Sequence, residues 1–187
     1  MYKRQVPNYL AGFVGKPVLP LDAPEVSAAI ERVQKRTDAL LNCGGTHRPE
    51  WFHRKLGDIL YEGCGVARDE AGLLDALTKV RELREEFWRD VKVVGTGNRL
   101  NQELEKAGRV ADFIELGEVM ILDALDRRES AGAHFRNEYA TEAGEAKRND
   151  DDWCAVSAWE TRPDGTKVRH SEPLSFSLID LQVRDYR

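Results

Sequence analysis

The sequence VADFIELGEVMILDAL, which covers residues 110–125, decides the fold. A helix that is apolar on all sides is buried inside a protein, whereas a surface helix carries one apolar stripe. We therefore expect residues 110–125 to form the central helix of a helical domain. The apolar side chains that would point to nearly every side of this helix are Val110, Phe113, Ile114, Leu116, Val119, Met120, Ile121, Leu122 and Leu125.

Three amphipathic segments precede this central helix. Apolar residues recur at helical spacing in residues 22–41, 49–62 and 69–91, which predicts one helix in each range. Three or four helices with short connections are typical of a bundle. The outer face of the third helix is predicted to be a solvated face with charge pairs along it. Its charged residues are Lys79, Arg81, Glu82, Arg84, Glu85 and Glu86.

The two ends of the chain differ from the helical part. Closely spaced prolines and glycines in residues 6–21 predict an extended lead-in rather than a helix or strand. The turn signal PDGT at 163–166 lies between two β-type segments, and residues 174–183 are expected to add an extended piece. The predicted fold class is mainly α, a helical bundle of three to four helices followed by a small β-hairpin C-terminal extension. The expected parts are a lead-in (1–21), the helical bundle (22–130) and a loop with the hairpin and tail (131–187).

Composition limits the function classes. The 187 residues carry 33 Asp and Glu against 28 Lys and Arg, a net charge of −5, which argues against a nucleic-acid-binding protein. No apolar run reaches the roughly 18 residues that a membrane span needs. The three cysteines, Cys43, Cys64 and Cys154, are too scattered for a disulfide framework. Composition therefore indicates a soluble, helix-rich domain of the cytosol.

Three patterns of chemical interest are incomplete. The sequence GTG at 95–97 begins a dinucleotide-binding fingerprint, but Leu100 replaces the third glycine and no βαβ unit surrounds it, so we predict a loop. Asp112, Glu115 and Glu118 form a carboxylate stripe without a Glu-x-x-His motif, so we expect ion pairs to arginines, or an interface, rather than a metal site. No cysteine has the spacing of a metal ligand. The residues alone predict no complete active site.

A cluster of charged and small residues follows the central helix. Residues 127–136 read RRESAGAHFR. Cations near a helix C-terminus are stabilised by the helix dipole, so one interpretation is a structural cap with internal ion pairs. The other interpretation is a docking surface that makes charge-assisted hydrogen bonds to another domain. Both depend on Arg127, Arg128, Glu129, Ser130, His134 and Arg136.

This cluster resembles the R-x-E-S-x-G-A-H-x-R signature near the C-terminus of succinate dehydrogenase and fumarate reductase flavoprotein subunits. Residues 101–113 and the hairpin are similar to a bacterial subgroup that pairs with a menaquinone-type membrane anchor, and residues 184–186 resemble the R-x-Y terminus of the family. Ala131 departs from the pattern, because many members have a second arginine there, so the docking contacts are not carried over whole. The matching signature positions are Arg127, Glu129, Ser130, Gly132, Ala133, His134 and Arg136.

The resemblance implies that the chain is one part of a larger enzyme. Such enzymes interconvert succinate and fumarate on a covalently held FAD and pass electrons through an iron–sulfur subunit to quinone. The flavin-binding and substrate-binding residues of the family match no position of this chain, so the resemblance transfers no catalytic, cofactor-binding or metal residue. FAD would be bound by a flavin domain that precedes this part, and the signature cluster would dock onto that domain.

The resemblance also implies partners and a location. The partners are the flavin-binding domain of the same subunit, the iron–sulfur subunit and the membrane anchor subunit. No nucleic acid is expected. The location is cytoplasmic, peripheral on the cytoplasmic membrane as part of this complex.

Two alternatives remain open, and the start of the chain carries one further expectation. L-aspartate oxidase has a similar signature, usually R-E-S-R-G-L-H, from which Ala133 and the long hairpin tail depart. A stand-alone helical interaction module would share only local patterns with the family. Residues 1–5, MYKRQ, match no family position and resemble the translation of a sequencing-library adapter. The expectation is that residues 1–21 are a lead-in from the flavin domain, with an artificial start.

Overall fold

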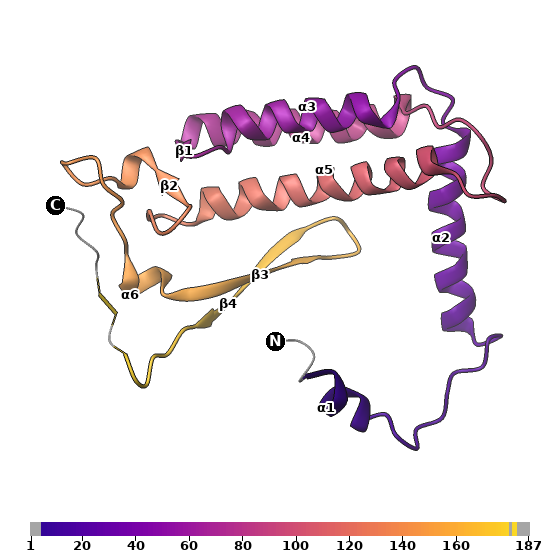
Figure 1. The fold of residues 1–187 in the computed structure, drawn as a ribbon, viewed down its shortest axis with the longest axis horizontal. Helices are drawn as coiled ribbons and strands as arrows, with labels where there is room; N and C mark the ends of the chain where they lie inside the picture. The colour runs from indigo at the N-terminus through magenta and orange to yellow at the C-terminus, as the bar shows by residue number, and fades with distance from the viewer. Residues whose placement is uncertain (1–4, 180, 183–187) are drawn as a thin grey trace. The chain divides into compact units, whose positions relative to one another are not determined.

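The structure is a computed structural model that describes residues 5–179, 181 and 182, and Figure 1 shows its helices and strands. The chain divides into two compact units at the bond between Ala39 and Leu40. A mainly helical fold with a C-terminal hairpin confirms the predicted fold class. The elements are α1 (Gln5–Ala11), α2 (Pro24–Asn42), α3 (Pro49–Gly63), β1 (Ala67–Arg68), α4 (Glu70–Asp90), α5 (Gln102–Asp126), β2 (Phe135–Arg136), the 3₁₀ turn η2 (Asn137–Tyr139), α6 (Asp150–Trp153), β3 (Ala155–Thr161) and β4 (Lys167–Pro173).

The first unit contains a short helix where the sequence predicted an extended lead-in. α1 begins at Gln5, and Pro7 stands in its first turn, where a missing N–H costs no helical hydrogen bond. The N–H of Gly12 donates to the carbonyl of Tyr9 at 3.1 Å and closes the helix in a turn. The prediction was therefore wrong for Gln5–Ala11. The side chains of residues 5–22 are all exposed.

The core of the second unit lies between α3, α4 and α5. The rings of Phe52 and Phe87 meet edge to face, with centroids 5.2 Å apart. Burying one large apolar side chain stabilises a fold by about 1.5–3 kcal/mol, so this layer holds the three helices together. The largest fully buried apolar side chains are Phe52, Leu73, Val80, Phe87, Val91, Ile114 and Ile121.

Side-chain caps set where α4 and α5 begin. The Asp69 carboxylate accepts a hydrogen bond from the N–H of Gly72 at 2.8 Å. The Asn101 side chain accepts from the N–H groups of Glu103 and Leu104, both at 3.1 Å. α5 consequently begins at Gln102, well before the predicted start at residue 110.

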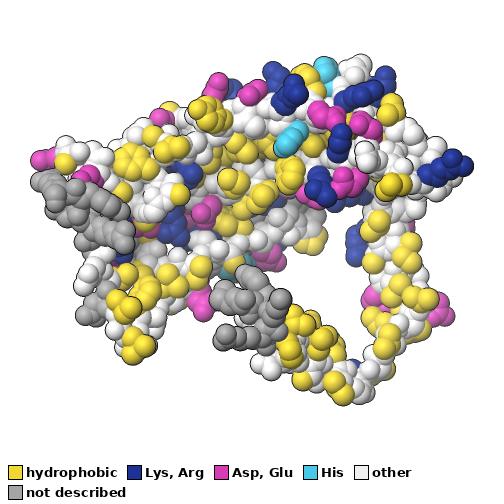
Figure 2. All heavy atoms as spheres, viewed as in Figure 1, with side chains coloured by type: hydrophobic (Ala, Val, Ile, Leu, Met, Phe, Trp, Pro, Cys, Tyr) yellow, Lys and Arg dark blue, Asp and Glu magenta, His cyan; other side chains and the backbone are white. Residues whose placement is uncertain are grey.

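α5 is open to solvent along one side, contrary to the prediction of a helix buried all round. Phe113, Leu116 and Met120 are 40%, 55% and 46% exposed. Figure 2 shows hydrophobic side chains in the region between α3 and α5. Among the described helices, α3 and α4 are the main neighbours of α5, and they cover the side that carries Ile114 and Ile121. An apolar pattern shows which side chains would be more stable away from water. It does not show whether another part of the chain packs against them.

The β-hairpin confirms the predicted turn at 163–166 and is held to α5 by polar contacts. β3 and β4 pair in antiparallel register, with Trp159 opposite Arg169. In Figure 1 the hairpin runs along α5 on the side away from α3 and α4. The contacts join Trp159 Nε1 to Asp123 Oδ1 (2.8 Å), Lys167 Nζ to Glu115 Oε2 (2.9 Å) and Arg169 Nε to Asp126 Oδ2 (2.7 Å).

Three further predictions concern the two ends of the chain and the loop between α4 and α5. After β4, residues 175–179 form no strand, so the extended piece predicted for 174–183 is not a further strand in its described part. The R-x-Y resemblance at 184–186 lies outside the described residues, as do residues 1–4 of the adapter-like start. The GTG sequence at 95–97 lies in the loop between α4 and α5, which confirms the predicted loop.

A tight contact joins the loop after α2 to the end of α4. A side chain at Gly45 would place its Cβ only 1.9 Å from the carbonyl oxygen of Asp90, so this approach requires glycine. The N–H of Thr46 donates to Asp90 Oδ1 at 2.8 Å, and His47 Nδ1 lies 2.6 Å from Asp90 Oδ2. The hydrogen bonds from His47 and Thr46 lower the pKa of Asp90 to about 2.

Candidate functional site

The centre of the site is the C-terminal end of α5, which Arg136 closes. Its Nη1 donates to the carbonyl oxygens of Ala124 at 2.8 Å and of Leu125 at 3.3 Å. The last carbonyls of a helix lack partners within the helix, and a cation there also suits the helix dipole. The Arg136 side chain is 3% exposed, and its Nε lies 3.1 Å from Glu138 Oε2. Arg136 therefore acts as an internal cap.

Ser130 and Glu129 fix the loop that returns Arg136 to the helix. The Ser130 hydroxyl donates to the carbonyl of Arg136 at 3.1 Å and accepts from its N–H at 2.8 Å. Glu129 accepts from Arg127 Nη1 at 2.7 Å and from the N–H of Asn149 at 3.0 Å. Arg127 also donates to the backbone carbonyls of Trp153 and Ala155. These contacts tie the end of α5 to the start of the hairpin.

His134 links this loop to the connection between α3 and α4. Its Nδ1 lies 2.9 Å from Arg68 Nη1, and its Nε2 lies 3.1 Å from the carbonyl oxygen of Arg127. Burial and the neighbouring positive charges lower the pKa of His134, although the hydrogen bond to the Arg127 carbonyl acts in the opposite direction. The sequence provided no signal for Arg68, because β1 and β2 are far apart in the chain and pair over two residues only.

Arg128 is the outward member of the cluster. It is exposed, and among the described residues its side chain forms no hydrogen bond or ion pair. It lines a cleft of about 640 Å³ together with Leu74 and Trp159. The structure thus brings all six predicted residues together. Arg127, Glu129, Ser130 and Arg136 make the contacts expected of a structural cap, while Arg128 is available to a partner.

A second charged cluster lies where α4 crosses α5. The Glu118 carboxylate receives Arg81 Nε at 2.7 Å and Arg84 Nη1 at 2.5 Å. Burial alone would raise the pKa of Glu118, but the hydrogen bonds and charges of the two arginines outweigh it and lower the pKa. Glu115 pairs with Arg84 and with Lys167. The predicted ion pairs of Glu115 and Glu118 are confirmed. Arg81 is exposed, as predicted for the outer face of α4, whereas Arg84 is half-buried, and both pair with α5.

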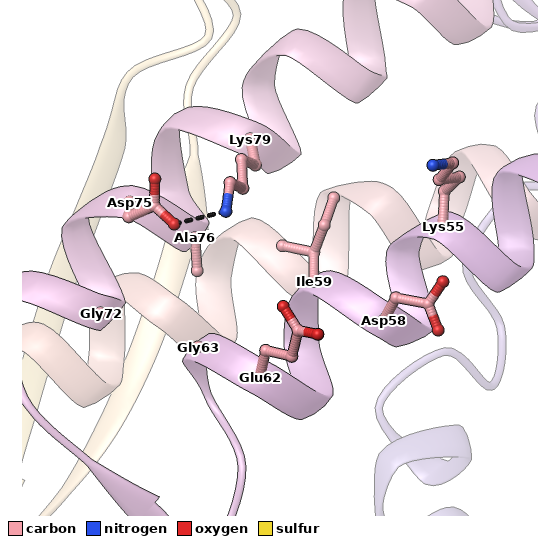
Figure 3. Close-up of a pocket in the computed structure, with 9 residues that line it drawn as sticks. All are labelled: Lys55, Asp58, Ile59, Glu62, Gly63, Gly72, Asp75, Ala76 and Lys79. Carbon is pink, nitrogen blue, oxygen red and sulfur yellow. Dashed lines mark ion pairs between the residues drawn. The ribbon is translucent and has the colours of Figure 1, made fainter.

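A groove of about 310 Å³ lies between α3 and α4. Figure 3 shows the residues that line it. A Cβ added at Gly63 would lie 2.5 Å from the Cβ of Ala76, so glycine allows the two helices to approach closely here. Asp75 forms an ion pair with Lys79 at 2.6 Å. Three carboxylates and two lysines line this groove. No group of three potential metal ligands occurs anywhere in the described part of the chain.

A second groove, of about 240 Å³, is apolar and lies between α3 and α5. The rings of His53 and Phe113 lie 5.6 Å apart. The groove carries the exposed side of α5 and has no cover from a described residue on its open side. It is lined by His53, Leu56, Gly57, Leu60, Phe113, Leu116, Gly117 and Met120.

The loop at 95–97 does not fit the pyrophosphate of a dinucleotide such as FAD. A dinucleotide site requires a strand before its glycine loop and a helix N-terminus against the pyrophosphate. The loop at 95–97 instead follows the helix α4. Asn101 already caps the N-terminus of α5. Among the described helices, none has the length and hydropathy of a membrane span.

An arginine-closed helical bundle followed by a hairpin defines the class of this domain. The chain belongs to the family described as the fumarate reductase flavoprotein C-terminal region, whose model matches residues 53–186. This match favours the succinate dehydrogenase and fumarate reductase resemblance over L-aspartate oxidase and over a stand-alone module.

Individual relatives agree with this family. The chain is 26% identical over 160 residues to the succinate dehydrogenase flavoprotein subunit of Bacillus subtilis, covering 85% of this chain and 26% of that subunit. It is 28% identical over 184 residues to the fumarate reductase flavoprotein subunit of Helicobacter pylori, covering 96% of this chain and 24% of the relative. The chain thus spans about a quarter of the length of the curated relatives it matches.

Solved structures share the fold. The Escherichia coli quinol fumarate reductase superposes with a TM-score of 0.71 at 24% identity, over 83% of this chain and 26% of that one. An apo succinate dehydrogenase of Mycobacterium smegmatis superposes with a TM-score of 0.69 at 22% identity, over 90% of this chain and 27% of that one.

Proposed function

We propose that this chain works as the C-terminal helical domain of a flavoprotein subunit that interconverts succinate and fumarate. The observation that carries the proposal is the signature cluster closed around the end of α5, inside the region that the family model matches. The domain takes no chemical step itself. FAD, which the remaining part of the subunit would hold, would supply the redox chemistry between succinate and fumarate.

The domain would pack against the flavin-binding part through its first unit. Residues 6–21 contain a single charged residue, Lys16, although 33% of the whole chain is charged. The large side chains of this segment, such as Tyr9 and Val18, are 69% and 91% exposed. A surface with few charges and several aromatic or aliphatic groups is typical of an interface core. This composition supports residues 1–21 as the lead-in from a flavin domain.

The signature cluster would make a separate, polar contact with the flavin-binding part. Within the set Arg127, Arg128, Glu129, Ser130, His134 and Arg136, the inward side chains hold the shape of the loop. Arg128 would contact the partner directly, because it is exposed and has no partner among the described residues. An arginine suits recognition of a carboxylate, since it offers two parallel donors.

Partners outside the subunit follow from the family. We include an iron–sulfur subunit and a membrane anchor subunit, with the complex peripheral on the cytoplasmic side of the membrane. The support is that solved structures with this fold include a quinol-fumarate reductase with menaquinol and Mycobacterium smegmatis Sdh1 in complex with UQ1. Electrons would leave FAD through the iron–sulfur subunit towards such a quinone.

The proposal is tested by the chain alone and by a reconstituted pair. We expect the purified chain to show no flavin absorbance and no oxidation of succinate or aspartate with an artificial electron acceptor. We expect it to bind the Bacillus subtilis relative that lacks its own C-terminal quarter, measured by co-purification. R128E should weaken this binding, whereas R99E, at an exposed arginine of the α4–α5 loop, should not. A flavin-loaded, active chain would contradict the proposal.

A further inference from the structure

The pairing of β1 with β2 is short and depends on side-chain contacts. Ala67 lies opposite Phe135, and Arg68 lies opposite Arg136, in a parallel pair of two residues each. Two-residue strands contribute few backbone hydrogen bonds, so this pair is not stable by itself. It nevertheless joins the α3–α4 connection to the loop that closes α5.

The ring of His134 bridges the two segments only in one protonation state. A guanidinium can donate hydrogen bonds but cannot accept them. Arg68 Nη1, at 2.9 Å, must therefore donate to Nδ1, which cannot carry a proton. The carbonyl of Arg127 can only accept, so Nε2 at 3.1 Å must carry the proton. The neutral ring with its proton on Nε2 satisfies both contacts.

The charges around the ring disfavour any second proton. The guanidinium groups of Arg68, Arg127 and Arg136 face His134 from β1, the end of α5 and β2. Carboxylates offset two of these cations, because Glu129 pairs with Arg127 and Glu138 pairs with Arg136.

Arg68 is the exception among these three arginines. Its Nε donates to the neutral carbonyl of Gly65 at 2.9 Å, and no carboxylate pairs with it among the described residues. A protonated His134 would therefore face an uncompensated cation directly.

We propose that the contact between His134 and Arg68 is an acid-sensitive latch that holds the α3–α4 connection to the closed end of α5. A proton added at Nδ1 removes the acceptor of the Arg68 hydrogen bond and places two cations side by side. The β1–β2 pair then loosens while the helical core stays folded, because apolar side chains such as Phe52 and Phe87 hold it together. Loss of the proton restores the latch.

NMR titration of the full isotope-labelled chain between about pH 5 and 8 tests the latch, since a histidine ordinarily titrates near pH 6.5. The ring signal of His134 is assigned by its absence from H134Q. We expect its midpoint to lie below 6.5, and the amide signals of Ala67, Arg68 and Arg136 to move with the same midpoint. In H134Q, which keeps a donor and an acceptor without titrating, those amides should not respond.

Variants at Arg68 separate the latch from general instability. R68M should raise the midpoint of His134, whereas R68K, which restores a donating cation, should return it towards the original value. R99M, at an exposed arginine in the α4–α5 loop, should leave the midpoint unchanged. A His134 midpoint at or above 6.5 would overturn the proposal. So would amides of β1 and β2 that stay fixed while the ring titrates.

Discussion

Arg84 Nη1 of α4 lies 2.5 Å from Oε2 of Glu118 on α5, and the Glu118 side chain is only 4% exposed. A carboxylate so buried is costly unless charged hydrogen bonds replace its water. Here two arginines do so, and each keeps part of its side chain in solvent. The packing of α4 against α5 therefore buries the negative charge of Glu118, which needs the positive charges of the two arginines beside it.

Glu118→Gln should destabilise the fold, because it removes the charge that both arginines match. Hydrogen bonds to charged groups contribute about 1.5–3 kcal/mol, so we expect a loss in this range at pH 7. Urea unfolding followed by circular dichroism measures it. Glu85→Gln, on the exposed face of α4, is the matched control and should change the free energy of unfolding by less than about 0.5 kcal/mol.

Arg136→Met should be more damaging than Arg128→Met, although both remove one guanidinium from the same cluster. A methionine side chain has no N–H to donate, so Arg136→Met would remove the hydrogen bonds to the carbonyls of Ala124 and Leu125, of which the first is buried. Each lost charged hydrogen bond costs about 1.5–3 kcal/mol. Thermal unfolding of the two variants compares them directly. Equal melting temperatures would show that Arg136 is not a structural cap.

Asp90→Asn should remove a pH-dependent contribution to stability. The pKa of Asp90 falls from 3.8 to about 2 on folding, so the unfolded chain binds its proton at higher pH. The stabilisation from this group is therefore complete above pH 3.8 and is lost as the pH falls towards 2. Unfolding midpoints at several pH values should converge for the wild-type chain and D90N at the acid end. A constant difference at every pH would contradict this assignment.

Gly45→Ala and Gly57→Ala should act in opposite directions. The added Cβ at Gly45 would lie 1.9 Å from the Asp90 carbonyl oxygen and must displace backbone, at a cost of about 1–3 kcal/mol. Gly57 lies within α3, and a Cβ there meets nothing within 4 Å. Alanine at Gly57 should stabilise the helix by about 0.5–1 kcal/mol. Chemical denaturation of both variants measures the contrast.

The helices of the second unit could be predicted from the spacing of their apolar residues, since these residues lie on one side of each helix and pack against the neighbouring helices. The open side of α5 could not be predicted. The apolar residues around Leu116 in the sequence are the same whether or not another surface packs against this side of the helix. The α1 helix was missed because Pro7 and Gly12 suggest a break, yet Pro7 occupies the first turn.

The candidate site could be predicted in its position but not in its contacts. The residue types of 127–136 indicated a charged cluster at the end of the central helix. Whether Arg136 or Arg128 turns inward depends on the path of the loop, which Ser130 determines through two backbone hydrogen bonds. The role of Arg68 depends on a strand pair between distant segments, and no local pattern encodes such a pair.

The polar attachment of the hairpin to α5 has a consequence for its response to ionic strength. The pairs Lys167–Glu115 and Arg169–Asp126 are electrostatic, and salt screens partly exposed charges over about 8–10 Å. Burial of Phe52, Phe87 and their neighbours is not weakened in this way, and salting-out ions strengthen it. Added sodium sulfate should therefore tighten the three-helix core while it loosens the hairpin, so one solute acts in opposite directions on two neighbouring layers of the same unit.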